Sequence, residues 1–165
     1  MNNFPKRKQI RLSDYDYSQN GYYFITICTK ERKTLFWDDV GADIIRPNLS
    51  SYGKIVKTAI KAIPKHYLNV SVDKYVIMPD HIHLILVISN NETNGHINGQ
   101  IISAPTVMRV IGQMKRWVSK EIGFSIWQKS FYENIIRNEN DYITKTEYML
   151  NNPLKYSVEN NADKV

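Results

Sequence analysis

The chain has 165 residues, of which 42% are apolar and 23% charged, and it contains only 7 Gly and 6 Pro. This composition excludes collagen-like and wholly disordered proteins, and the length predicts a single domain over residues 1–165 that folds without disulfides or a structural metal. The single cysteine excludes an internal disulfide framework and a cysteine-rich zinc site, while the formal net charge of +6 indicates a polyanionic partner such as nucleic acid.

The first half of the chain predicts a strand, a helix and two more strands. Residues 22–29 are aromatic or β-branched, as is typical of a strand. Ser50 or Ser51 can cap a helix whose apolar residues recur every three or four positions until Pro64. Two further strands are predicted over residues 70–78 and 81–89. The second of these is apolar on both faces, so we expect it in the centre of a sheet.

The second half predicts a loop, a helix, an extended segment and a last helix. Residues 90–105 carry four Asn and two Gly without periodicity, which predicts a long loop. Thr106 caps the next helix, and residues 126–137 look extended. The last helix, residues 141–151, is expected to end because of Pro153.

The order β-α-β-β-α-β plus a further helix predicts an α+β protein. One antiparallel sheet with two helices packed on a single face, the ferredoxin-like arrangement, fits this order. Residues 1–11 carry basic side chains but no apolar core of a secretion signal, and the longest strongly apolar run, residues 84–88, is too short to span a bilayer. We therefore expect a cytoplasmic protein with a polar, flexible N-terminal arm and no membrane association.

Basic residues gather in the N-terminal arm and in the helix that follows Thr106. The candidate phosphate-contacting residues of that helix are Arg109, Lys115, Arg116 and Lys120. Such a face is by default an ordinary solvated helix face. It becomes a DNA-binding surface only if it lies beside the reactive site.

His81 and His83 are two residues apart on a predicted strand, so both side chains leave the same face and can converge on one ion. The alternative is a pair of packed or surface histidines. Two imidazoles also leave a metal site incomplete, so a third donor must come from another element.

Tyr148, Asn152 and Lys145 share one face of the last helix at spacings of three and four residues. We expect Tyr148 to project opposite to the apolar stripe, which consists of Tyr142, Ile143, Thr146, Met149 and Leu150. The alternatives are that Tyr148 is an amphipathic surface residue and that Asn152 is a C-terminal cap.

Three segments of the chain carry a combination of motifs. They are YVIMPDHIHLIL at residues 75–86, with a histidine-hydrophobic-histidine pattern, WQKSFYENIIRN at residues 127–138 and EYMLNNPLKY at residues 147–156. In this order they resemble the motifs of the single-tyrosine transposases of the HUH class, in their REP-associated branch. The resemblance covers residues 11–155 and implies a ferredoxin-like or RRM-like sheet with an additional C-terminal catalytic helix.

The resemblance implies a role for four residues. It makes His81 and His83 metal ligands, completes the metal site with Asn152, and makes Tyr148 the nucleophile. This chain departs from the family pattern at Asp80, where Asn is common, and at Asn134, where His is common. Asp80 adds a carboxylate that could join the ligand set.

The implied activity is that of a transposase, a site-specific endonuclease and strand transferase that cleaves hairpin-flanked single-stranded DNA through a 5′-phosphotyrosine. A Mg²⁺ or Mn²⁺ ion would neutralise the phosphate. Lys145 is a candidate for activating the phenol and for contacting DNA. Action by a homodimer, with Tyr148 serving its own subunit or a partner's, is left open.

Two other interpretations fit parts of the sequence. A non-catalytic nucleic-acid-binding module on the same fold explains the charge and the aromatic residues but not His81, His83 and Tyr148. A metal-dependent hydrolase that uses a metal-bound water would take Asp80 or Asp141 as a ligand.

Overall fold

The computed structural model describes residues 16, 19–38, 48–89, 96–97, 100–101 and 106–162 of the chain. Four strands form an antiparallel sheet in the order β2-β3-β1-β6. Their bounds are Gly21–Cys28 for β1, Val70–Ile77 for β2, His81–Ile88 for β3 and Tyr132–Ile136 for β6. This order is that of the ferredoxin-like fold, so the predicted α+β architecture is confirmed.

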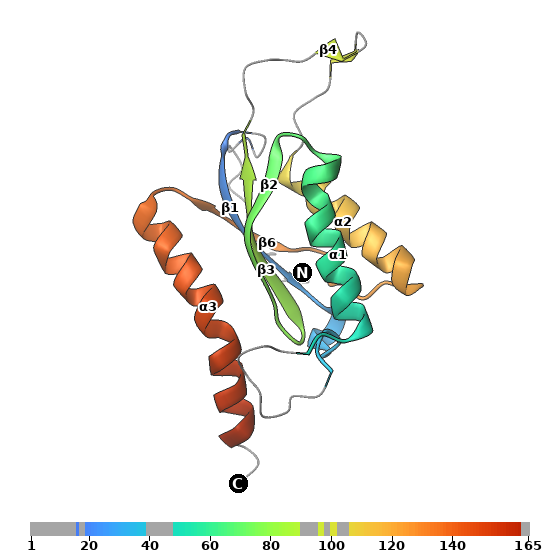
Figure 1. Cartoon of the computed structure of the whole chain (residues 1–165), viewed down its shortest axis with the longest axis vertical. Helices are drawn as coiled ribbons and strands as arrows, with labels where there is room; N and C mark the ends of the chain where they lie inside the picture. The colour runs from blue at the N-terminus through green and yellow to red at the C-terminus, as the bar shows by residue number, and fades with distance from the viewer. Residues whose placement is uncertain are drawn as a thin grey trace, which may run out of the picture.

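Helices cover both faces of the sheet (Figure 1). The helices α1, Ser51–His66, and α2, Val107–Ile122, lie together on one face, and α3, Glu139–Ala162, lies on the other. The main core forms between the sheet, α1 and α2. A second, smaller cluster forms on the α3 side from Phe24, Ile85 and Met149. The main core therefore stabilises the fold, and the face of the sheet toward α3, where fewer apolar residues pack, has room for a polar site.

Successive side chains of β1 alternate between the main core and the face of the sheet toward α3, where the smaller cluster lies. Tyr23, Ile25 and Ile27 are fully buried in the main core. The residues between them point to the α3 face, where Phe24 joins the smaller cluster and Thr26 lines a pocket. Because successive strand residues leave opposite faces, one strand serves the core and the site at once.

Strand β3 lies between β1 and β2 and is buried on both faces, as its continuous apolar run predicts. It pairs with β1 so that His81 faces Cys28 and His83 faces Thr26. Both histidines therefore leave the same face of the sheet, as predicted from their spacing, and the structure shows that this is the face covered by α3.

The predicted caps of α1 and α2 are confirmed, whereas α3 starts at Glu139, two residues before the predicted start. Ser50 caps α1 by accepting a hydrogen bond from the Gly53 backbone N–H at 3.0 Å, and its hydroxyl donates to the Leu35 carbonyl at 2.6 Å. Thr106 caps α2 by accepting from the Arg109 N–H at 3.3 Å.

Both predicted helix ends at proline are wrong. Helix α1 runs past Pro64 to His66, and α3 runs past Pro153 to Ala162. A proline removes one helical hydrogen bond, and tertiary contacts can offset that loss. Beyond Pro153, Tyr156 packs edge-on against Trp37 with ring centroids 5.6 Å apart, so continuing the helix adds a contact.

Two other segments differ from expectation. Only residues 132–136 of the extended segment 126–137 form a strand, although Trp127 also makes an isolated bridge with Thr29. Within the predicted loop 90–105, β4, His96–Ile97, pairs with β5, Gln100–Ile101, and the remaining loop residues lie outside the described part. The predicted arm, residues 1–15, also lies outside it.

None of the helices in the described part of the chain combines the length and the apolar composition that a membrane span requires.

Two helical glycines give a matched test of the packing. A Cβ at Gly53 would lie 2.2 Å from the Phe36 carbonyl oxygen, whereas a Cβ at Gly112 would meet no atom within 4 Å. Gly53→Ala should lower the free energy of unfolding by about 1–3 kcal/mol, because backbone must move. Gly112→Ala should raise it by about 0.5–1 kcal/mol through helix propensity. Urea denaturation measures both, and equal stabilities would contradict the packing of α1.

Candidate functional site

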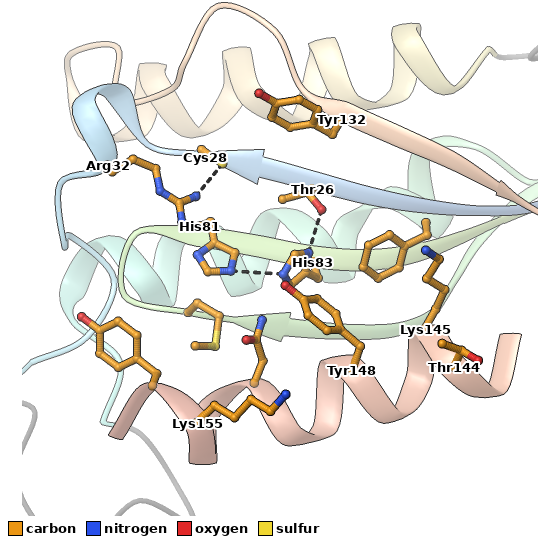
Figure 2. Close-up of a pocket in the computed structure, with 14 residues that line it drawn as sticks. Thr26, Cys28, Arg32, His81, His83, Tyr132, Thr144, Lys145, Tyr148 and Lys155 are labelled. Carbon is orange, nitrogen blue, oxygen red and sulfur yellow. Dashed lines mark hydrogen bonds between the residues drawn. The ribbon is translucent and has the colours of Figure 1, made fainter. Parts of the chain in front are cut away.

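A pocket of about 630 Å³ opens between α3 and the sheet (Figure 2). Strand residues from β1 and β3 line it on one side, and residues along α3 line it on the other. His81, His83, Tyr148 and Asn152 all line this pocket, and so does Lys145. The structure therefore brings together all the residues predicted for metal binding and nucleophilic attack.

The two imidazoles face each other through their Nε2 atoms, which lie 3.1 Å apart (Figure 2). The Nδ1 atom of each ring, on the side away from the other imidazole, has its own hydrogen-bond partner. The His81 Nδ1 lies 2.5 Å from an oxygen of the Asp80 carboxylate, and the His83 Nδ1 lies 2.8 Å from the Thr26 hydroxyl. Ligands about 2.1 Å from a common metal ion are themselves about 3.0–3.4 Å apart, so this Nε2 separation suits one ion.

Protonation of the pair also suits metal binding. An ionised carboxylate only accepts hydrogen bonds, so the His81 Nδ1 carries the proton that it donates to Asp80, and in the neutral form of the ring the lone pair is then on the His81 Nε2. Burial, with a smaller contribution from the charges of His81 and Arg32, lowers the pKa of His83 to about 3. His83 is therefore neutral near pH 7, which is the state that binds metals.

Both carboxylate oxygens of Asp80 are engaged. One contacts His81, and the other pairs with the Arg32 guanidinium at 2.8 Å. Burial alone would raise the pKa of Asp80, but the His81 hydrogen bond and the charges of His81 and Arg32 together hold it below its ordinary value. Asp80 therefore stays ionised and orients His81 from behind the pair.

The donor set fits a cation only if Asn152 contributes. Among the described residues, no three His, Cys, Asp or Glu side chains lie close enough to hold a metal ion. The amide nitrogen of Asn152 is buried and has no hydrogen-bond partner within the described structure. A buried amide without a partner costs about 1–3 kcal/mol, and a half turn of the amide exchanges its nitrogen for its oxygen. A bound cation or phosphate in the pocket would satisfy this group.

Tyr148 points into the pocket from α3 (Figure 2). Its ring packs edge-on against His83 and Phe24, with centroids 5.3 and 6.3 Å away, yet 47% of the residue stays exposed. The phenol therefore lies beside the histidine pair and remains open to a ligand.

The prediction that the apolar stripe opposite Tyr148 forms the buried side of α3 is wrong. Ile143 and Leu150 of the predicted apolar stripe are exposed, and Met149 is the buried residue among residues 139–156 of α3, the part of the helix whose side chains are described. Lys145 and Asn152 flank Met149 on the sheet-facing side, so the helix presents a partly polar face to the sheet. Asn152 is also not a C-terminal cap, because α3 continues beyond it.

Comparison with known proteins assigns the chain to a family. Residues 17–152 match the family described as IS200-like transposases. The chain belongs to this family. An uncharacterised protein of Haemophilus influenzae is 34% identical over 164 residues, covering 90% of this chain and 88% of the relative. A second protein of that organism, provisionally named a REP-associated tyrosine transposase, is 25% identical over 150 residues and covers 88% and 78% respectively.

The fold of this IS200-like transposase also has a solved counterpart. A REP-associated tyrosine transposase bound to a REP hairpin matches it with a TM-score of 0.59 and 20% identity, covering 88% of this chain and 74% of that one. The resemblance recognised from the three sequence motifs is thus confirmed at the level of family and fold.

The predicted phosphate-contacting residues of α2 are not in the pocket of the transposase. Helix α2 covers the opposite face of the sheet from α3. Arg109, Arg116 and Lys120 are exposed there. The Lys115 ammonium instead donates to the Gln128 carbonyl at 2.7 Å, and burial lowers the pKa of Lys115. Of the basic residues predicted to contact DNA, Lys145 alone lines the pocket.

The residues that line the pocket but were not predicted from sequence include Thr26, Arg32 and Lys155. Thr26 supports His83 through the strand register, which the sequence does not specify. Arg32 reaches the pocket from a turn without periodicity. Lys155 also lines the pocket, and its spacing of three and seven residues from Asn152 and Tyr148 is the signal that could have indicated the shared helix face.

Proposed function

We propose that this transposase cleaves and rejoins hairpin-flanked single-stranded DNA through a covalent 5′-phosphotyrosine on Tyr148. One observation carries the proposal: an accessible phenol lies beside two imidazoles whose Nε2 atoms face each other in an open pocket. A non-catalytic binding module gives no reason for this arrangement.

The residues present fit a Mg²⁺ or Mn²⁺ ion held by His81, His83 and Asn152. Such an ion, when bound, would neutralise a non-bridging phosphate oxygen and make phosphorus more electrophilic. Imidazole and amide donors suit these ions only moderately, so phosphate oxygens and water would complete the ligand set. Asp80 and Thr26 would keep the two imidazoles in orientation from behind.

The proposed step is a transfer of the phosphoryl group to the tyrosine. The Tyr148 oxygen forms a bond to phosphorus as the bond from phosphorus to the 3′-oxygen of the neighbouring nucleotide breaks. The phenol gives its proton to solvent, and the leaving 3′-oxygen takes one up. The Lys145 ammonium, which lies over the Phe24 ring at 5.4 Å, stabilises negative charge in the pocket. Attack by another 3′-hydroxyl reverses the step and joins strands without ATP.

DNA as the substrate is supported by charge and by exposure. The chain carries a formal charge of +6, and Lys145, Lys155 and Arg32 border the pocket. A scissile phosphate must reach the phenol, which single-stranded or hairpin-flanking DNA allows. The exposed basic residues of α2 lie on the opposite face of the sheet from the pocket, so the condition for a DNA-binding surface, a position beside the reactive site, is not met.

The decisive variant is Tyr148→Phe. It keeps the ring packing on His83 but removes the attacking oxygen, so hairpin-flanked DNA from the gene's own flanks should bind within about twofold of wild type and form no covalent adduct. Denaturing gels measure the adduct. Tyr142→Phe is the matched control on the same helix, because its hydroxyl is occupied by Asp73 and Lys74, and it should form the adduct.

Peptide mapping decides the nucleophile independently. An adduct on Tyr142 or Tyr156, or an adduct formed by the Phe variant, would contradict the assignment. Cutting without any adduct would favour a hydrolase, and DNA binding without cutting would favour a binding module.

Metal binding is tested by changing both histidines to Ala. Mn²⁺ at about 100 times its dissociation constant should stabilise the wild-type protein by about 2.7 kcal/mol in thermal unfolding, and the double variant should lose both this increment and cleavage. His66→Ala, at an exposed position near the end of α1, is the control and should keep both. Unchanged stabilisation of the double variant by Mn²⁺ would place the ion elsewhere.

The salt dependence of DNA binding tests the α2 surface. Because α2 lies on the far face of the sheet from the pocket, changing Arg109, Arg116 and Lys120 to Ala should leave the slope of log affinity against log salt unchanged. A slope reduced by about 0.7 for each phosphate interaction removed would instead make this face a DNA-binding surface. The charge-matched control changes three exposed lysines of α1: Lys54, Lys57 and Lys61. If both triple variants give the same slope, the α2 residues form an ordinary solvated helix face.

A further inference from the structure

The turn that follows β1 has an unusual backbone. Glu31 and Arg32 have φ angles of 59° and 54°, in the left-handed region that residues with a Cβ avoid. In the described part of the chain, they are the only non-glycine residues in that region. Residues are held in such conformations only where the surrounding structure imposes them.

Hydrogen bonds fasten this turn to the segment that precedes β3. The Asp80 carbonyl accepts from both the backbone N–H and the hydroxyl of Thr29, each at 2.9 Å. The Pro79 carbonyl accepts from the N–H groups of Leu35 and Phe36 at 2.8 and 3.0 Å. The two ends of the turn are thus anchored on the residues next to His81.

The turn delivers the Arg32 guanidinium to the back of the histidine pair (Figure 2). Its Nε lies 2.8 Å from one Asp80 oxygen, and its Nη1 donates to the Cys28 sulfur at 2.8 Å. The other Asp80 oxygen holds His81. A continuous chain of polar contacts therefore runs from Arg32 through Asp80 and His81 to His83.

We propose that Arg32 is a positioning residue that acts through Asp80 on His81. With one carboxylate oxygen fixed by Arg32, the other is aimed at the His81 Nδ1 and keeps the proton there. The His81 Nε2 then presents its lone pair toward His83. The proposal rests on the proposed function only in taking this histidine pair as the metal-binding pair.

Arg32 affects the orientation of Asp80 more than it affects the stability of the protein. The Arg32 side chain is 51% exposed, so solvent weakens its attraction to Asp80. The Asp80 side chain is only 13% exposed, and its two oxygens contact Arg32 and His81. The orientation of this carboxylate therefore determines how it holds the His81 ring. A carboxylate beside a histidine fixes the tautomer of the ring, and its loss allows the other tautomer.

Arg32 also lines the pocket, so it could grip a DNA phosphate directly instead. The two roles differ in how Arg32→Ala combines with Asp80→Asn. A residue that acts only through Asp80 has no further effect once Asp80 is changed. A residue that contacts DNA independently adds its effect to that of Asp80→Asn.

The first measurement uses the metal-free protein. Nitrogen-15 NMR of the imidazoles should show His81 with its proton on Nδ1 in wild type, and Arg32→Ala and Asp80→Asn should both shift population toward the Nε2-protonated form. Lys33→Ala removes a cation from the same turn, one that pairs with exposed Glu31, and should leave the tautomer unchanged. An unchanged tautomer in Arg32→Ala overturns the proposal.

The second measurement is Mn²⁺ affinity by calorimetry. Arg32→Ala and Asp80→Asn should each weaken binding by about 10-fold or more, as loss of a group behind a ligating histidine does. The double variant should bind Mn²⁺ no more weakly than Asp80→Asn alone. If the fold-losses of affinity of the two single variants multiply in the double variant, Arg32 does not act through Asp80 and the proposal is overturned. Should wild type form no DNA adduct, the proposed function fails, while the tautomer measurement still judges the role of Arg32.

Discussion

The pairing register between β1 and β3 determines which side of the sheet carries the polar site. Thr26 lies opposite His83 and Cys28 opposite His81, on the face turned toward α3. A slip of one residue would turn both imidazoles into the apolar core under α1 and α2, because side chains alternate along a strand. The buried residues Ile82, Leu84 and Leu86 of β3 oppose that slip, since it would turn them out of the main core toward α3. The core therefore sets the position of the site without contacting the substrate.

Two buried imidazoles and a buried carboxylate each require a hydrogen-bond or ion-pair partner. These partners also determine which nitrogen atom of each imidazole is free to bind a ligand. Asp80, Thr26 and Arg32 occupy the polar atoms that face away from the pocket, while the Nε2 atoms stay directed into it. Polar groups that would destabilise a core are thereby held in a fixed orientation. The site is arranged before any ligand arrives, which reduces the reorganisation that binding requires.

Much of this arrangement follows from local sequence patterns. The period of two places His81 and His83 on one face, the continuous apolar run places β3 in the centre, and Ser50 and Thr106 mark the helix starts. The shared helix face of Tyr148, Asn152 and Lys145 also follows from spacing alone. Each of these features depends on residues close in the chain, and such patterns can be recognised in the sequence without a structure.

The features that could not be predicted depend on contacts between distant segments. The direction in which α3 faces does not follow from its apolar residues, because Ile143 and Leu150 are exposed while polar residues face the sheet. Arg32 could not be predicted because a left-handed turn, imposed by hydrogen bonds to residues 79–80, carries it to the site.

The thin attachment of α3 has a mechanical consequence. Few apolar side chains join this helix to the sheet, chiefly Met149 against Phe24 and Ile85, whereas the histidine pair is built on strands fixed by the main core. The phenol and the imidazoles thus belong to two bodies with unequal anchoring. Hydrogen bonds of Tyr142 with Asp73 and Lys74 and the edge-on packing of Tyr156 on Trp37 add to the attachment of α3, so polar and aromatic contacts hold much of this helix. The separation between the phenol and the imidazoles, 5.3 Å between the ring centroids of Tyr148 and His83, therefore depends on the contacts that hold α3, whereas the separation within the histidine pair depends on the main core.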